Sequence, residues 1–514
     1  MEEDTLESTV SLVLPPAAKS VIRKIYQLIS DGRAAEALPR LSELDGLGRG
    51  NPPMLNLTRG TILVDIASDL NDADLARRGV SLIKGVDPAS LPEPAQQAYW
   101  YNLGNGHAAI YNIKKIPSGV GRSLDNDFKR AKECYQQAKS LRAKSPESSA
   151  RLHTNYGILL RTVGRHVEEI EEYDEALKAA PDFAMALWHK SRGLRWYSRL
   201  VERPTRRSAL LEAWHLLKKS LEVGLEPGFE AKALKELGEL ERILKHPKNP
   251  SDRHTEHAPD SDIEKKYIKF CLDSRLYLHP CPVSSHEAYQ DPLSVRFPTS
   301  KRGEYLELRS DRLAFIKQEY IAARFLLFSY RLQEPDLSFV DGGTFLPLVE
   351  ESKGHIYLQF LILSFRAAYA ILDKIAYFLN EFCKLGEKAE AICLRERLFL
   401  AKGALRPELI KYDGPQLSAL FDLAREFSKG QPLYSLRECR HKLEHRCVPV
   451  RSTRTSAKGN TASEGGGTRG TQADDLNEID LREDAMRLLR VVRAAIFYVF
   501  YFVRVSVEPP KPEE

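Results

Sequence analysis

The residues best suited to chemistry lie together in the stretch from Ser435 to Cys447, SLRECRHKLEHRC. Arg437, Arg440, His441 and His445 fall within a few helical turns of one another there. Histidine can give or take a proton near neutral pH, and a guanidinium can hold two phosphate oxygens at once. Cleavage of RNA by its own 2′-hydroxyl needs a base, an acid and a cation for the charged transition state, and it needs no metal. The stretch is therefore a candidate site for this chemistry.

The same stretch carries signals for a helix. Ser435 and Glu438 match the S-x-x-E capping box, which predicts that the helix starts at Ser435. On a straight helix Arg440 and His445 point about 140° apart, so they do not form a tight pair within one chain. A second copy of the chain could supply the complement. His441 and His445 are four residues apart and share a face.

Two other interpretations of these residues compete with this one. Arg440 could solvate a surface while His445 caps a core. Cys439, His441, His445 and Cys447 also suggest zinc, but on one helix their side chains point in scattered directions and cannot converge on one ion. We therefore expect neither a metal site nor a cofactor.

A long apolar helix is predicted from Ile356 to Lys384, and polar residues recur on it every seven positions. These are Arg366, Asp373 and Asn380. Buried polar groups need partners, so Asp373 and Asn380 could face the candidate helix and support its histidine or the RNA. The alternative is a solvated edge, or a structural salt bridge from Asp373 to a neighbouring helix.

The second half of the chain supplies the helices that would position this site. Residues 246–262 are polar, with Pro, Ser, Asp and three His, and predict a linker. An irregular, proline-rich section follows, and residues 452–476 are predicted to be a disordered insertion because they lack an apolar period. No alternating run with hairpin turns predicts a strand, so we expect an all-α fold. The predicted helices are Ser310–Arg331, Ile356–Lys384, Pro415–Ser428, Ser435–Cys447 and Leu481–Val505.

The first half contains repeated signals for helical hairpins. Trp100, Leu103 and Gly104 match the W-x2-L-G core of a tetratricopeptide (TPR) repeat, and a further unit runs from Ala150 to Pro181, close to the TPR period of about 34 residues. These residues resemble TPR proteins, and the resemblance implies a helical solenoid over 15–245 with a groove for a protein partner. The solenoid could equally be a scaffold that packs only against the second half.

The candidate site also resembles a known family. Arg440 to His445, RHKLEH, fits the R-x4-6-H signature of the HEPN superfamily, and a preceding helix (Ser364–Phe382) and a closing helix follow the order of its helical bundles. The resemblance covers about 263–505. It implies that His445 is the general acid or base, that Arg440 clamps the phosphate, and that His441 orients His445 or contacts phosphate. It also implies a homodimer in which two motifs share a cleft, or, as in some relatives, nucleotide binding without cleavage.

Composition gives only weak information on the partners and the cellular compartment of this protein. The chain has 76 basic and 71 acidic residues, a net charge of +5, which permits RNA binding without arguing for it. Its seven cysteines are scattered, which favours reduced thiols in a cytoplasm. The most apolar run, Ala494 to Val503, is too short to span a membrane, so we expect a buried core helix and no membrane partner. Arg437 to Arg446 concentrates basic residues, as an RNA site would.

These observations combine into one hypothesis and one rival. The hypothesis is a cytoplasmic, metal-independent endoribonuclease acting on RNA such as tRNA, regulated by its TPR-like region as in antiviral defence or toxin-like systems. Arg440, His445 and His441 would form the catalytic group, supported by Asp373, Asn380 and Arg437. The rival is a non-catalytic adaptor, in which the repeats bind a protein and the HEPN-like domain dimerises or binds nucleotide. No Walker A, dinucleotide-binding or HExxH motif is present in the sequence.

Overall fold

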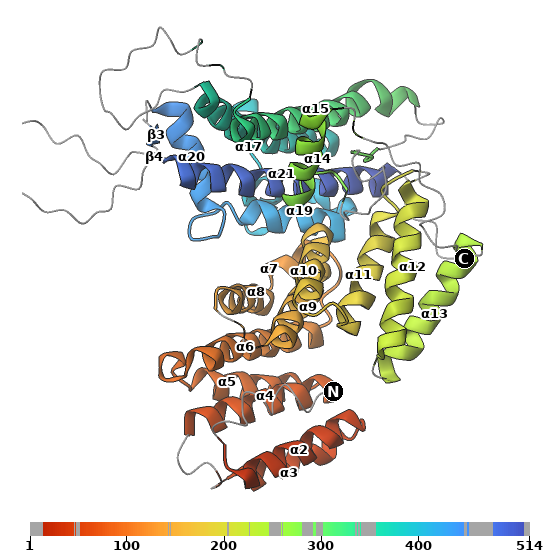
Figure 1. Cartoon of the computed structure of the whole chain (residues 1–514), viewed down its shortest axis with the longest axis vertical. Coiled ribbons are helices and arrows are strands. Elements are labelled where there is room, and N and C mark those ends of the chain that lie inside the picture. Colours follow the sequence, from red (N-terminus) through yellow and green to blue (C-terminus); the bar gives the residue numbers. More distant parts are fainter. Residues whose placement is uncertain are drawn as a thin grey trace, which may run out of the picture. The chain divides into compact units, whose positions relative to one another are not determined.

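The protein is all-α, as the sequence predicts, in the part of the chain that the computed structural model describes (Figure 1). The chain divides into two compact units: Met1–Arg199 with Arg206–Pro250, and Leu200–Thr205 with Ser251–Glu514. The structure describes residues 14–45, 47, 52–141, 143, 145–202, 205–225, 227–245, 259, 261–279, 291–294, 302–334, 337, 340, 356–446, 450–451 and 476–507. Most of the predicted linker, and of the predicted disordered insertion, lies outside these residues.

The first unit is a succession of helices packed as neighbours along the chain. α4 packs on α5, α6 on α8, and α9 on α10. Gly32 and Gly164, with φ of +71° and +79°, turn the chain between paired helices, because only glycine adopts that conformation without strain. The helices are α2 (Pro16–Ser30), α3 (Ala34–Arg40), η1 (Leu41–Leu44), α4 (Pro52–Leu70), α5 (Ala73–Lys84), η2 (Pro88–Ser90), α6 (Glu93–Ile113), α7 (Val120–Leu124), α8 (Asn126–Lys139), α9 (Pro146–Thr162), α10 (His166–Ala179), α11 (Ala184–Tyr197), α12 (Thr205–Val223) and α13 (Pro227–Leu244).

Glycines set the close helix contacts in two of these pairs. A Cβ at Gly104 would lie 2.8 Å from the Tyr135 ring, and one at Gly157 would lie 2.5 Å from Tyr173. In both pairs a glycine of one helix faces a tyrosine ring of the other. Trp100 packs against the apolar cores on both sides of α6, so it joins neighbouring hairpins. The arrangement fits the predicted TPR-like hairpins, and the assignment to TPR repeats stays a prediction.

The second unit is a bundle built on three long helices. α15, α17 and α21 pack against one another, and α19 packs on α21. β3 and β4 pair in parallel at the two ends of the predicted insertion, and Leu476, its last residue, belongs to β4. The elements are α14 (Asp262–Asp273), α15 (Arg302–Leu332), α17 (Ile356–Cys383), η6 (Ala389–Ala391), α18 (Glu396–Phe399), β1 (Leu400–Ala401), β2 (Ala404–Leu405), η7 (Pro407–Tyr412), α19 (Pro415–Arg425), α20 (Tyr434–His445), β3 (Val450–Arg451), β4 (Leu476–Asn477) and α21 (Glu478–Val507).

The section that the sequence predicts to be irregular begins with a helix. α14 already begins at Asp262, the last residue of the predicted linker, because the side chain of Ser261 accepts a hydrogen bond from the Glu264 amide. This is a serine N-cap, which satisfies one of the free amides of the first turn. The section predicted to be irregular therefore opens with a capped helix.

A buried arginine ties the start of the second unit to α15. Arg324 is 2% exposed and its guanidinium reaches both carboxylate oxygens of Asp291, at 3.1 and 2.9 Å. It also donates to the Leu276 carbonyl oxygen at 2.9 Å and to the Tyr267 hydroxyl at 2.8 Å. A buried charge is stable only when paired and hydrogen-bonded in this way. Asp291 in turn accepts the Leu278 amide at 2.7 Å.

The apolar run Ala494–Val503 of α21 is buried in the bundle core, as predicted, apart from the half-buried Tyr501. α17 has a core-facing side of the same kind, including Phe365 and Ile375, both fully buried. Within the described residues, α17 is long and apolar enough to cross a membrane by length and composition, a test that a buried core helix also passes. Its packing against α15 and α21 is that of a core helix.

Candidate functional site

The candidate residues lie on α20, which packs against α17 and α21. The helix begins at Tyr434, not at Ser435, and its N-cap residue Leu433 makes no side-chain capping bond. The predicted capping box is therefore wrong. Leu433 is 3% exposed and its amide donates to the Glu426 carbonyl oxygen, so a buried turn sets the start of the helix and places Ser435 inside it.

One row of α20 side chains faces α17. Arg440 Nη2 lies 3.2 Å from Asp373 Oδ2, and one turn later Glu444 accepts both Nε and Nη2 of Arg366, at 2.9 and 3.0 Å. Residues four apart on a helix share a face, so two ion pairs fix the rotation of α20 on α17. Of the two expectations for Asp373, the salt bridge to a neighbouring helix is observed, and the neighbour is the candidate helix itself.

Arg440 is held on a second side by an aromatic ring. Its guanidinium carbon lies 5.0 Å from the centroid of the Tyr369 ring. Burial raises the pKa of Tyr369 to about 12, and nearby Asp373 adds to this effect. Burial also raises the pKa of Asp373 above its usual range, against the opposing influence of Arg440 and Arg395. Arg440 is thus a positioned cation, one-third exposed, between a ring and a carboxylate.

The two histidines of α20 form the neighbouring, solvent-facing row. His441 and His445 are both exposed, and their ring centroids are 5.0 Å apart with the planes inclined at 56°. The prediction that they share a face is confirmed. The alternative in which His445 caps a core is wrong, because its side chain lies in solvent. An exposed imidazole pair beside an anchored guanidinium can exchange protons with a substrate arriving from solvent.

Further cations surround this row. Arg437 lies one turn before Arg440 on α20, and its guanidinium carbon lies 5.7 Å from the centroid of the Tyr434 ring. Arg395, at the N-cap of α18, makes no ion pair with any residue in the described part of the chain, and its Nε is buried without a hydrogen-bond partner. Its charge acts on both Tyr369 and Asp373. Arg395 and Arg440 therefore both act on the Asp373 carboxylate.

Two other predicted residues lie elsewhere. Asn380 does not join the group: its amide nitrogen and oxygen are both used on the Glu387 backbone, at 3.2 and 3.0 Å, where they hold the loop after α17. Cys439 is 6% exposed and burial raises the pKa of its thiol to about 12, so it is a packing residue. Over the described residues, no three His, Cys, Asp or Glu side chains are grouped so as to hold a metal. Cys447 lies outside those residues.

Sequence reasoning missed three contributors to the site. Tyr369 lies four residues before Asp373, and Glu444 lies four residues after Arg440, so the helical period alone places each beside a candidate already chosen. Arg395 carries no such signal. It comes from a separate segment of the chain, and only tertiary structure brings it to α17.

A comparison with family models supports a HEPN domain in the second unit. Within that class, residues 311–506 match the family model of LA2681-like HEPN domains, a span that includes all of α17, α19 and α20. The match begins inside α15, whereas the second unit already includes α14 and Asp291 upstream. It does not reach the first unit, and no curated protein matches the chain.

Proposed function

We propose that this protein is a metal-independent endoribonuclease whose second unit cleaves RNA through the 2′-hydroxyl. The observation that carries the proposal is the two-sided arrangement of α20. His441 and His445 are exposed, while Arg440 on the adjacent row is anchored by Asp373 and Tyr369. Proton-transfer groups open to solvent beside a fixed guanidinium suit a polyanionic substrate. The HEPN match supports the class of activity.

In the proposed reaction the 2′-hydroxyl oxygen attacks the neighbouring phosphorus while its proton passes to a base. The bond from phosphorus to the 5′-oxygen breaks as that oxygen takes a proton from an acid. His445 serves in one of these roles, and His441 orients it or contacts a phosphate oxygen. Arg440 binds the non-bridging oxygens, which carry extra charge in the transition state. The products are a 2′,3′-cyclic phosphate and a 5′-hydroxyl.

We further propose that two copies of the chain complete the site. Arg440 faces α17 and His445 faces solvent, so one α20 helix does not present both to the same phosphate from one direction. A homodimer through the HEPN domain, with two α20 helices facing each other, supplies the acid and the base from different protomers. Such an arrangement has two-fold symmetry and forms two equivalent sites.

The first unit is proposed to regulate this activity in the cytoplasm by binding a protein partner. No two of the described cysteines are joined by a disulfide, which fits the reducing compartment proposed here. A regulated, metal-free RNase of this kind suits antiviral defence or a toxin-like system. Should the site prove inactive, the same architecture is an adaptor in which Arg440 and Arg395 bind a nucleotide phosphate.

The test is RNA cleavage by the purified full-length protein in EDTA, with tRNA or total RNA as substrate. We expect cleavage with 2′,3′-cyclic phosphate ends, and its loss in His445→Ala. Glu438→Gln is the matched control, because Glu438 is exposed on the same helix and takes no part in the proposed site. The proposal is contradicted if the RNA stays equally intact with the wild type and with His445→Ala, both with and without added cellular extract as a source of the trigger. That result favours the adaptor.

A further inference from the structure

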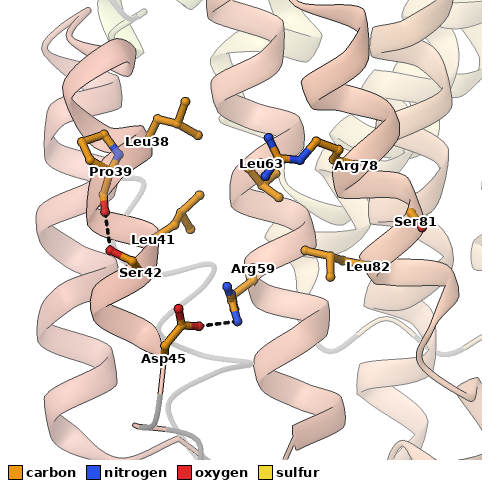
Figure 2. A pocket seen from close by; sticks show the side chains of 10 residues that line it. All are labelled: Leu38, Pro39, Leu41, Ser42, Asp45, Arg59, Leu63, Arg78, Ser81 and Leu82. Atoms are coloured by element: carbon orange, nitrogen blue, oxygen red, sulfur yellow. Dashed lines mark hydrogen bonds and ion pairs between the residues drawn. The ribbon is translucent and has the colours of Figure 1, made fainter.

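The first unit contains a hollow that the RNase proposal does not use. It measures about 640 Å³ and lies between α3 and η1 on one side and α4 and α5 on the other (Figure 2). This is within the usual size of a ligand pocket, about 300–1,000 Å³. Its walls are half apolar and half polar. The lining residues are Leu38, Pro39, Leu41, Leu63 and Leu82, with Ser42, Asp45, Arg59, Arg78 and Ser81.

The position of its two arginines is fixed by backbone packing. A Cβ at Gly60 would lie 2.8 Å from the Gly79 carbonyl oxygen, and one at Gly79 would lie 2.8 Å from that of Gly60. α4 and α5 therefore approach each other most closely at these glycines. Arg59 and Arg78 each directly precede one of them, so the close contact between the helices fixes the backbone of both arginines.

The two arginines differ in what already binds them. Arg59 Nη1 pairs with Asp45 Oδ1 at 2.7 Å, but the Asp45 side chain is 58% exposed, and a pair so open to water contributes little. Arg78 is exposed and makes no hydrogen bond or ion pair with any residue that the structure describes. In Figure 2 Arg59 points toward Asp45, Arg78 lies at the other end near Leu63, and Leu41 and Leu82 lie between these ends.

We propose that this hollow binds an acidic, amphipathic peptide segment of a partner protein. An apolar side chain of the peptide packs among the leucines, and acidic side chains on either side of it reach Arg78 and Arg59. Two cations separated by an apolar wall match a peptide that carries two carboxylates around a hydrophobic residue. A lipid or fatty acid with one head group satisfies only one of them. The inference rests on the partner-binding role proposed for the first unit and names the kind of partner, and its test does not depend on RNA cleavage.

The experiment is fluorescence anisotropy with the full-length chain and a fluorescein-labelled peptide in which glutamate pairs flank a leucine pair. Two control peptides replace the glutamates by glutamine or the leucines by serine. Arg78→Gln should weaken binding about tenfold, the size expected for a hydrogen bond between charged groups. Arg77→Gln removes the same charge from the neighbouring position on α5, where Arg77 pairs with exposed Asp74, and should leave the affinity within about twofold.

Charge reversal gives a second test that a folding defect cannot imitate. Arg78→Glu should lose the glutamate peptide and gain affinity for a peptide with lysines in place of the glutamates, while the helical circular dichroism stays unchanged. The proposal is overturned by any of three results: no binding of the glutamate peptide to the wild type, equal binding of the glutamine peptide, or equal effects of Arg78→Gln and Arg77→Gln.

Discussion

The buried pair of Arg324 and Asp291 gives the sharpest test of how the second unit holds its fold. Asp291→Ala leaves the guanidinium, 2% exposed, with only its bonds to the Leu276 carbonyl and the Tyr267 hydroxyl, and leaves the Leu278 amide unsatisfied. Breaking a buried pair from one side costs about 3–5 kcal/mol, because an uncompensated charge stays buried. At a slope of about 2 kcal/mol per M urea, the unfolding midpoint should fall by about 2 M.

The assay exploits the placement of the tryptophans. All four (Trp100, Trp188, Trp196 and Trp214) lie in the first unit, so tryptophan fluorescence follows that unit alone, while far-ultraviolet circular dichroism follows both. Asp291→Ala should lower the urea midpoint of the second unit, which only circular dichroism detects. It should leave the midpoint measured by tryptophan fluorescence unchanged.

Two controls decide whether burial is the reason. Glu334→Ala breaks the pair that Glu334, just after α15, forms with Lys266 of α14, and both partners of this pair are about half exposed. It should cost at most about 1 kcal/mol. Replacing both buried partners, as Arg324→Met with Asp291→Leu, should recover most of the loss, because no unpaired charge remains. If Asp291→Ala costs no more than Glu334→Ala, the argument from desolvation is refuted.

Three further predictions concern the site and the first unit. Arg440→Lys keeps the charge but cannot bind two phosphate oxygens at once, so the rate of RNA cleavage should fall about a hundredfold. Arg437→Lys should reduce the rate less. Equal losses for the two variants in a cleavage assay would contradict the role of Arg440 in binding the phosphate. The hydrogen bonds from Arg366 lower the pKa of Glu444 in the folded protein. The stability that these bonds give is therefore complete at a pH above the pKa of Glu444 in the unfolded chain, and it is lost as the pH falls through the pKa of Glu444 in the folded protein. Glu444→Gln should therefore cost about 0.2–1 kcal/mol at pH 7 in urea unfolding, and a gap that did not shrink as the pH is lowered would contradict this assignment. Gly157→Ala should destabilise the first unit by about 1–3 kcal/mol in tryptophan-monitored unfolding, because the added Cβ meets the buried Tyr173 ring. Gly238 of α13 has open space around it, so Gly238→Ala should stabilise the same unit by about 0.5–1 kcal/mol.

The sequence by itself determined the features that depend on local periodicity and residue size. Apolar spacing predicted the long helices, including the buried run of α21, and the absence of alternation predicted an all-α chain. The W-x2-L-G match and the spacing of the following unit predicted helical hairpins at Gly104 and Gly157, and at both glycines a Cβ would meet a tyrosine ring of the partner helix. The R-x4-H spacing likewise located the candidate site and the shared face of its two histidines.

Only the tertiary structure decided which partners the site residues take. Periodicity placed Asp373 and Asn380 on one stripe, yet α20 crosses α17 at Asp373, and the loop after α17 uses Asn380. The start of α20 was mispredicted because a buried turn ending at Leu433 outweighs the capping preference of Ser435. Arg395 and the hollow beside Arg78 arise from segments apart in the chain. Such contacts depend on how helices cross, which local spacing does not encode.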